Sequence, residues 1–495
     1  MTPAWTITSA FAGALLVLLL PARRGDLARW IALGAAIPGA LAALGACFAK
    51  LSSPTSPDWQ VNVPWIPQFG IRFHLAADGM SLALLLLTGI VAIAGVLFSW
   101  NVSHRPRAFF AWFLTIIGGV YGVFLSRDAF LLFVCYEVVI LPKYMLIAAW
   151  GSTNREYGAM KLTMYSIAAS ALILVGLAVA YVVAGGTSFD LAHLATACSQ
   201  SSPTLQAWAF PLLFLGFAIL AGIWPFHTWA PTGHVAAPTA ASMLLAGVVM
   251  KLGAFGALCV AMPMFPAGFA LWKPVIAALA VVGILYGALT ALSQKDLKFV
   301  IGYSSVSHMG LILLGLAAAN PWGLRGAVMQ MISHGIIAGL LFGIAGRVVY
   351  ERTHTRDLDA LKAFNLWKSL PAAALAFTLA TAASMGLPGF SGFVAEVSVI
   401  IGVWQANPWL CVAVAVGIIL TGAFSLRAMQ RAFFPVVSAD QAPPAPLEPL
   451  TWPEISAIAL LLAVSLAIGL YPQPWMDLID LGLRSPLFQP ILSLP

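Results

Sequence analysis

The sequence contains very few charged side chains. Of its 495 residues, 8% are Asp, Glu, Lys or Arg, whereas 61% are hydrophobic. Water-soluble domains have about 25% charged residues and about 45–50% apolar ones. The 24 Lys and Arg and 17 Asp and Glu side chains are too few to cover the surface of a soluble protein of this length. The composition therefore excludes a soluble globular protein and indicates a membrane protein.

Motifs that bind cofactors are also missing. The chain has neither a GxGxxG nor a GxxxxGK[ST] pattern, and its five cysteines show no CxxC or other metal-ligand spacing. We therefore expect no nucleotide, flavin, iron–sulfur cluster or other cofactor in this chain, and no metal site. The net charge of +7 predicts basic residues beside a membrane rather than a nucleic-acid partner. The cysteines are interpreted as small apolar residues in lipid or helix contacts: Cys47, Cys135, Cys198, Cys259 and Cys411.

The hydrophobic residues form long continuous runs. A run of about 20 apolar residues crosses the hydrocarbon core as a helix, whereas barrel strands would show alternating segments of about 10 residues. We therefore predict an all-α polytopic membrane protein with about 14 transmembrane helices. The runs cover residues 3–21, 29–49, 77–99, 108–126, 129–150, 158–184, 207–230, 236–261, 270–292, 299–318, 322–346, 369–404, 407–430 and 452–471.

Basic residues are distributed unequally between the two sets of loops. Sixteen Lys and Arg lie in or beside the loops after odd-numbered runs, six lie in or beside the loops after even-numbered ones, and two lie near the middle of runs. Because cytoplasmic loops are enriched in Lys and Arg, we expect the odd-numbered loops to be cytoplasmic and both termini to lie on the outer, periplasmic side. The first run has no basic segment before it and is followed by Arg23 and Arg24. It is therefore interpreted as a retained span rather than a signal peptide.

Four ionisable residues lie near the middle of apolar runs, away from the loops and helix ends: Glu137, Lys143, Lys251 and Glu396. Placing one such residue at the centre of a membrane helix costs about 2.5–3.5 kcal/mol, and residues of this kind usually mark ion or proton pathways. Structural ion pairs between helices are the alternative. Glu137 and Lys143 share one run, and their spacing puts them about 120° apart around a helix. They are therefore not expected to form a simple stacked pair.

Histidines extend this polar set. His308 and His334 lie inside the tenth and eleventh runs, and His227 and His234 flank an interruption in the seventh. Histidine titrates near neutral pH and can pass protons along a chain. Taken singly, each is more simply a hydrogen-bonded structural histidine, but beside four buried charges His308 and His334 are predicted to belong to a proton pathway, with His227 and His234 as weaker candidates. Serines accompany them at Ser304, Ser305, Ser307 and Ser333.

Two of the apolar runs are interrupted near the middle. The seventh contains Pro225 and Pro231, and the twelfth contains the segment GLPG at residues 386–389. Paired interruptions of this kind are typical of transporters built from inverted repeats. We predict that helices 4–8 and 9–13 form two inverted five-helix repeats, with helices 7 and 12 broken. The chain then divides into an N-terminal part, two repeats and a C-terminal part: 1–107, 108–261, 270–431 and 452–495.

Four long segments resemble a known family. The stretches FLLFVCYEVVILPKYMLIAAWG, WPFHTWAPTGHVAAPTAASMLLAGVVMKLGAFG, QKDLKFVIGYSSVSHMGLILLG and GLPGFSGFVAE are similar to the antiporter-like subunits of proton-pumping NADH-quinone oxidoreductase, respiratory complex I. They most resemble subunit M, the counterpart of mitochondrial subunit 4. The resemblance covers residues from about 77 to 432.

The resemblance implies a proton channel made of two half-channels that join at the middle of the membrane. The family's glutamate, lysine and second glutamate match Glu137, Lys251 and Glu396, and its connecting histidines match His308 and His334. Redox chemistry would take place in other subunits. The resemblance also implies L-, N- and K-type membrane subunits as neighbours, and a place in the bacterial inner membrane.

The sequence departs from the family pattern at one position. The family has a lysine seven residues before the histidine of PFHTW, where this chain has Leu220. Lys143 instead occupies a position where the family usually has an uncharged residue. We hypothesise that the lysine has moved to the fifth run, close to Glu137, because a flexible lysine stem can carry its ammonium group several ångströms. A purely structural or snorkelling Lys143 is the alternative.

Other functions stay open at this point. A D-type subunit of a multisubunit cation/proton antiporter would use the same buried residues to couple sodium to protons. A membrane subunit of an energy-converting hydrogenase is also compatible with the sequence. A membrane subunit that no longer conducts ions is the alternative from a different class.

Overall fold

Helices form nearly all of the molecule. The computed structural model describes residues 3–55, 59–435 and 447–494, so the first and last residues of the predicted division lie outside it. Within these ranges, twelve helices are long and apolar enough to cross a membrane. They are α2 (Leu27–Ser52), α3 (Gly79–Phe98), α4 (Pro106–Leu125), α5 (Ala129–Trp150), α6 (Arg155–Val183), α8 (Pro203–Ala221), α10–α12 (Thr239–Met264), α13 (Pro266–Ser293), α14 (Leu297–Ala317), α15–α16 (Pro321–Thr353), α20 (Pro408–Phe433) and α21 (Trp452–Leu470).

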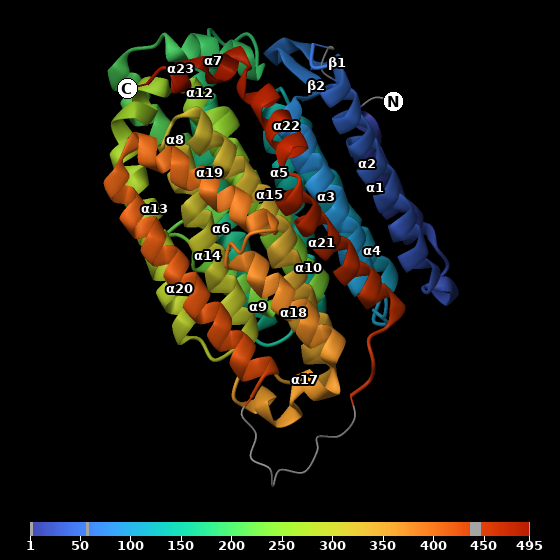
Figure 1. Ribbon diagram of the computed structural model, residues 1–495. Coiled ribbons are helices and arrows are strands. Elements are labelled where there is room, and N and C mark those ends of the chain that lie inside the picture. Colours follow the sequence, from blue (N-terminus) through green and yellow to red (C-terminus); the bar gives the residue numbers. More distant parts are fainter. Residues whose placement is uncertain (1–2, 56–58, 436–446, 495) are drawn as a thin grey trace.

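Shorter apolar helices occupy the two remaining predicted runs. They are α1 (Ala4–Leu19) and the pair α18 (Pro371–Ser384) and α19 (Ser391–Ala406). Helix α1 begins, and α23 (Gln489–Leu492) lies, at the same end of the bundle (Figure 1). A chain that begins and ends on the same side of a membrane crosses it an even number of times, which agrees with this arrangement. The count of about 14 crossings stays a prediction.

A β-hairpin is an element that the apolar runs of the sequence did not predict. Strand β1 (Trp59–Ile66) pairs antiparallel with β2 (Ile71–Ala77), with Val61 opposite Leu75. The segment WQVNV alternates apolar and polar residues, which is the period of a strand. The turn ends at Gly70, whose φ of 65° favours glycine. Strand β2 of the hairpin packs against α4 and α5.

Short elements cover the two ends of the bundle. Figure 1 places α7, α12, α23 and the hairpin at one end and α17 at the other. The densest group of basic residues, in the segment 347–368, leads into the end that carries α17. The elements are α7 (Leu191–Ser199), α9 (Trp229–Ala236), α17 (Leu366–Ser369), α22 (Gln473–Leu483), α23 (Gln489–Leu492), and the short turns η1 (Ala22–Arg24), η2 (Pro67–Phe69), η6 (Ala360–Phe364) and η7 (Pro486–Phe488).

Both interrupted runs are broken helices in the structure. Helix α8 stops at Ala221 and α9 begins at Trp229, while α18 stops at Ser384 and α19 begins at Ser391. A glycine follows each first half: Gly222 with a φ of 71° after α8, and Gly386 with a φ of 69° after α18. Left-handed glycines are a common way to end a helix. Both first halves therefore end in the same way, at a left-handed glycine.

A pair of aspartates recurs at the start of α5 and of α14. Asp128 caps α5 and forms a β-bridge with Asp190, and Asp296 caps α14 and forms a β-bridge with Asp357. The flanking hydrogen bonds also match, because Leu191 N–H donates to the Arg127 carbonyl, and Leu358 N–H donates to the Lys295 carbonyl, both at 2.8 Å. One pair lies beside the hairpin and the other near α17, at opposite ends of the bundle (Figure 1). This correspondence supports the predicted inverted repeats.

The pair of Asp128 and Asp190 is held by His74. Its Nδ1 lies 3.1 Å from Oδ2 of Asp190. Burial raises the pKa of the Asp190 carboxyl, but the hydrogen bonds from His74 and from the backbone N–H groups of His193 and Ala192 outweigh burial. The pKa of Asp190 is therefore held below its ordinary value, and the carboxylate stays ionised at neutral pH.

A buried carboxylate joins α21 to the end of the eleventh span. Glu454 is 1% exposed, and its two oxygens accept hydrogen bonds from Arg347 at 2.8 Å and from Arg352 at 2.7 Å. One of them also accepts the backbone N–H of Thr451 at 2.8 Å and so caps α21. Removing one partner of a buried ion pair strongly destabilises a protein, because the other partner is left as an uncompensated buried charge.

We therefore expect Glu454→Gln to destabilise the protein by about 3 kcal/mol or more, because Arg352 would lose its charge partner and Arg347 would keep only its pair with Glu351. The measurement is the midpoint of thermal unfolding of the purified protein in detergent, which should fall by several degrees. Glu156→Gln is the matched control, because Glu156 is exposed. Equal midpoints for the two variants would contradict the assignment.

Candidate functional site

Lys251 lies at the centre of the eighth predicted span. Its side chain is fully buried, in α11 (Met250–Gly256) between the π-helical segments η3 (Leu245–Val249) and η4 (Ala257–Ala261). π-Helical turns inside α-helices are frequent at functional sites. The Nζ atom donates to the carbonyl oxygen of Ala246, in η3, and lies 2.6 Å from Nδ1 of His334. The ammonium group is thus stabilised by one carbonyl and one ring nitrogen.

His334 joins Lys251 to His308. His334 lies in α15 (Pro321–Gly343) and His308 in α14, with their ring centroids 5.2 Å apart. When Lys251 is protonated and donates to Nδ1 of His334, the neutral ring carries its proton on Nε2. That Nε2 is buried and has no hydrogen-bond partner in the part of the chain that the structure describes. The ring can therefore gain a proton at one nitrogen and lose one at the other.

Glu396 completes the line on the far side of the histidines. It is 6% exposed and lies in α19, one turn after the break in the twelfth run. Its carboxylate packs directly on Gly386, where any side chain would collide with it. A cavity of about 10 Å³ separates it from the two histidines, at the lower limit for one water molecule. The cavity is lined by His308, Gln330, Ser333, His334, Ile337, Ala383, Ser384, Gly392 and Glu396.

The serines beside the histidines divide into two groups. Ser304 and Ser305 donate to the Ile301 carbonyl and Ser307 donates to the Ile284 carbonyl, so these hydroxyls satisfy nearby backbone. Ser333 instead begins a chain, with its Oγ 2.9 Å from that of Ser391, at the start of α19. The break in the twelfth run is thereby tied to the helix that carries His334.

Glu137 and Lys143 lie apart from this line, on α5. Lys143 is buried, with Nζ 5.4 Å from the ring centroid of Tyr136. Within the described residues the two side chains form no ion pair shorter than 4.0 Å, and Oε1 of Glu137 is buried without a hydrogen-bond partner. Helix α5 continues through Pro142 without a break. The lysine therefore interacts with the glutamate only at longer range.

Leu220 is buried at the last turn of α8. Helix α6 packs against both α5 and α8. Leu220 is thus an apolar residue next to the helix break. Lys143 is buried on a different helix, α5. The hypothesis that Lys143 replaces a lysine at this position stays a prediction.

The two weaker histidine candidates lie at the break in the seventh run. His227 lies in the break itself and contacts the rings of Tyr286 and Tyr303, with centroid distances of 5.0 and 6.3 Å. His234 lies in α9, is 0% exposed, and contacts Phe342 at 5.3 Å. Both nitrogens of each ring lack a hydrogen-bond partner among the residues that the structure describes.

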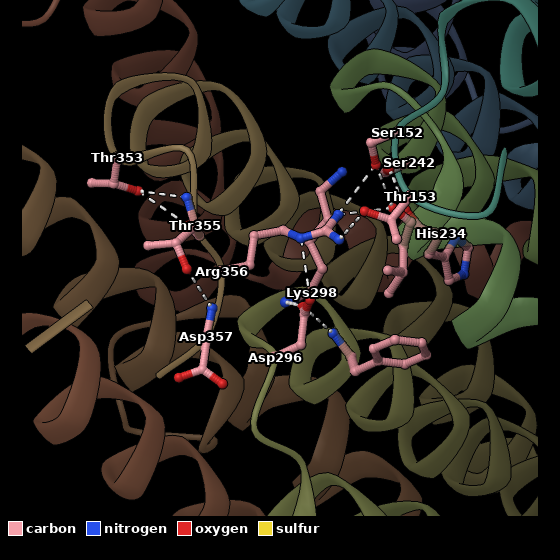
Figure 2. A network of polar contacts seen from close by, with 12 residues as sticks. Ser152, Thr153, His234, Ser242, Asp296, Lys298, Thr353, Thr355, Arg356 and Asp357 are labelled. Atoms are coloured by element: carbon pink, nitrogen blue, oxygen red, sulfur yellow. Dashed lines mark hydrogen bonds and ion pairs between the residues drawn. The ribbon is translucent and has the colours of Figure 1, made fainter. Parts of the chain in front are cut away.

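The sixteen basic residues counted with the loops after odd-numbered runs include Lys298, just before the tenth run, whereas the structure places this residue inside a helix. Lys298 is 3% exposed and lies in the first turn of α14, where Nζ donates to the Ala237 carbonyl at 3.1 Å (Figure 2). Asp296 two residues earlier is the signal that was overlooked, because an N-cap aspartate starts a helix and brings the next residues inside it. Arg356, assigned to the same side, is also buried.

Across residues 3–55, 59–435 and 447–494, no group of three or more His, Cys, Asp or Glu side chains is placed to hold a metal ion. The five cysteines are unpaired, and Cys47, Cys198 and Cys259 are buried in helix contacts.

Comparison with known proteins places this geometry in a family. The family described as NADH:quinone oxidoreductase/Mrp antiporter, TM matches residues 126–421. NAD(P)H-quinone oxidoreductase chain 4 of a Synechococcus strain is 40% identical over 422 residues, which are 83% of this chain and 78% of that protein. NADH-quinone oxidoreductase subunit M of Pseudomonas aeruginosa is 36% identical over 493 residues, which are 96% and 95% of the two chains.

A solved structure is similar over the whole length. One chain of respiratory complex I from Thermus thermophilus with bound NADH superimposes with a TM-score of 0.88 at 25% sequence identity, covering 99% of this chain and 100% of that one. The sequence match, the length of the matched region and the superposition agree. The chain therefore belongs to the family of transmembrane subunits that NADH:quinone oxidoreductases and Mrp antiporters share.

Proposed function

We propose that this chain is a proton-translocating subunit in the membrane arm of an NADH-quinone oxidoreductase, of the subunit M or chain 4 type. The observation that carries the proposal is the line from Lys251 through His334 and His308 to Glu396, buried at the middle of the bundle. The names of its relatives and its membership of the family agree with this function. Other membrane subunits of the same complex are its partners, with L-, N- and K-type subunits as proposed neighbours.

Proton transfer along the line needs no redox group in this chain. The Lys251 ammonium gives a proton to Nδ1 of His334, and the ring releases the proton on Nε2 towards His308 and the cavity. Glu396 accepts at the far side, and a second proton returns Lys251 to the ammonium form. Charge rearrangement arriving from neighbouring subunits would drive each transfer, while electrons move between NADH and quinone elsewhere in the complex.

The proposed location is the bacterial inner membrane, with both termini on the periplasmic side. Two observations support this orientation: the sixteen-to-six division of basic residues between loops and the position of α1 and α23 at one end of the bundle. The positive-inside rule assigns the basic end to the cytoplasm.

Sodium transport is the second candidate, because the family includes Mrp antiporters. The buried line favours protons, since it consists of one amine, two imidazoles and one carboxylate, whereas Na⁺ prefers several oxygen ligands. Proteoliposomes prepared without sodium decide between the two ions. Pumping that requires added Na⁺ would replace the proton proposal.

Lys251→Met should lower the rate of proton translocation by at least about 10²-fold, because the line loses the group that donates to His334. Glu396→Gln should have the same direction of effect, since an amide cannot titrate. The measurement is dye-detected acidification of proteoliposomes that contain the purified complex, supplied with NADH and quinone. Lys368→Met, at an exposed position, is the control; normal pumping by Lys251→Met would disprove the proposed function.

Lys143→Met tests the relocated lysine. If Lys143 has taken over the role of the missing lysine at Leu220, this variant should lose proton translocation to about the same extent as Lys251→Met, with normal assembly. Glu137→Gln, which removes the long-range charge partner, should weaken translocation in the same assay. A Lys143→Met complex that pumps normally, beside a Lys251→Met complex that does not, would show that Lys143 is structural.

A further inference from the structure

Five arginines gather at one corner of the bundle, at the end opposite the β-hairpin (Figure 1). The turn between α1 and α2, the start of α2 and the start of α4 supply them, and we call them the arginine corner: Arg23, Arg24, Arg29, Arg105 and Arg107. Helices α1, α2 and α4 pack against one another, and Arg107 donates to the Leu20 carbonyl at the end of α1. Neighbouring elements therefore hold these positive charges together.

The arginine corner has no carboxylate to balance it. Among the described residues, none of its five guanidinium groups forms an ion pair within 4.0 Å. The arginines of the segment 347–356, at the same end, all have such partners: Arg347 and Arg352 pair with Glu454, and Arg356 pairs with Asp296. The excess positive charge is therefore concentrated at the arginine corner.

Arg29 is held in place by a tryptophan. One of its Nη atoms donates to the Trp100 carbonyl at 3.1 Å, and its guanidinium carbon lies 5.4 Å from the centroid of the Trp100 ring. Its Nε has no hydrogen-bond partner among the described residues. A guanidinium carries five N–H donors in a rigid fork that matches the oxygens of a phosphate group. Arg29 thus has a fixed position and unused donors.

Three tryptophans surround this position. Trp30, at the start of α2, contacts Trp100 at a centroid distance of 4.6 Å and Trp452, at the start of α21, at 6.3 Å. Trp30 and Trp452 are 52% and 54% exposed. Indole rings collect at the headgroup level of a membrane, because one end of the ring is apolar and the other is polar. The cluster therefore places Arg29 at headgroup depth.

An exposed apolar stripe continues from Trp30 along α2. Its members are Trp30, Ile37, Leu41, Leu44 and Phe48. Their spacing follows the 3.6-residue period, so they lie on one face, and at 1.5 Å per residue the stripe is about 27 Å long. The hydrocarbon half of one leaflet is about 15 Å thick. The stripe is therefore long enough to contact the acyl chains of a lipid whose headgroup lies at the arginine corner.

We propose that the arginine corner is a binding site for an anionic phospholipid. The phosphate group pairs with Arg29 and its neighbouring arginines, Trp30 and Trp452 lie at headgroup level, and the acyl chains run along the apolar stripe of α2. Free phosphate would use only the charged part of this surface, whereas a phospholipid uses both parts. The site is separate from the proton line, and its test does not depend on proton translocation.

Photolabelling of the purified complex tests this site directly. The probe is phosphatidylglycerol with a photoreactive group on its headgroup, and the labelled peptides are identified by mass spectrometry. Labelling is expected in the peptides that contain Arg29 and Trp452, and it should decrease as salt is added, because salt screens the attraction between arginine and phosphate. Equal labelling of these peptides by the matching phosphatidylcholine probe would show unselective lipid contact and overturn the proposal.

Arginine variants measure the contribution of charge. A lysine or arginine near an anionic lipid surface strengthens binding about fivefold, so Arg29→Gln should lower labelling about fivefold at low probe concentration, and Arg24→Gln/Arg105→Gln about 25-fold. Arg24 and Arg105 are exposed, so the double variant decides the matter if Arg29→Gln fails to assemble. Wild-type labelling of the double variant would overturn the proposal.

Tryptophan variants measure the contribution of the aromatic cluster. Trp30→Leu should lower the labelling severalfold. Trp367→Leu is the matched control, because Trp367 is 47% exposed beside Lys368, on α17, and it should leave labelling of the arginine corner unchanged. An equal decrease in both variants would contradict a defined site.

Two further outcomes would assign the arginine corner to another partner. Competition by inorganic phosphate as strong as that by unlabelled phosphatidylglycerol would show a site for free phosphate. An unlabelled corner in the wild-type complex, together with loss of a neighbouring subunit from Arg24→Gln/Arg105→Gln, would show a contact between subunits. Either result would replace the lipid site.

Discussion

Burial of a lysine amine among apolar helices is the constraint on which the rest of this structure depends. An ammonium group in the hydrocarbon region needs partners from the protein itself, because no bulk water solvates it there. Lys251 obtains two: the Ala246 carbonyl from its own π-helical turn and the His334 ring from the neighbouring span. The first partner requires a local change in helix geometry, and the second fixes how α11 and α15 pack.

Helix interruption provides the second half of the proton line. A continuous twelfth helix would bury its backbone groups in hydrogen bonds along its full length. The break after Ser384 instead brings Gly386 against the Glu396 carboxylate, and Glu396 lines the small cavity beside the two histidines. A similar break after Ala221 places His227 and His234 at the middle of the first half. Both breaks put titratable groups where an unbroken apolar helix has none.

The two ends of the bundle are held together by different contacts. At the basic end, Arg356 connects the loop after α5, the end of α9 and the cap of α14. At the other end, the Asp128 and Asp190 bridge joins α5 to α7 beside the hairpin. The two aspartate pairs are alike, and two residues after the Asp296 cap lies Lys298, which is buried. The residue at the corresponding position after the Asp128 cap is Phe130, so the two ends differ in charge at this position.

The sequence by itself determined the apolar spans, the unequal loop charges, the two helix breaks and the four ionisable residues in the membrane, because each depends on local composition or on the cost of burying a charge. It also predicted His308 and His334 as members of one polar line. Only the tertiary structure decided which residues meet: that His334 contacts Lys251, that Glu137 and Lys143 lie apart from this line, and that Lys298 is buried. The hairpin was missed because its alternation is short. Contacts between residues as distant as Lys251 and His334 depend on the packing of separate helices, which no local pattern encodes.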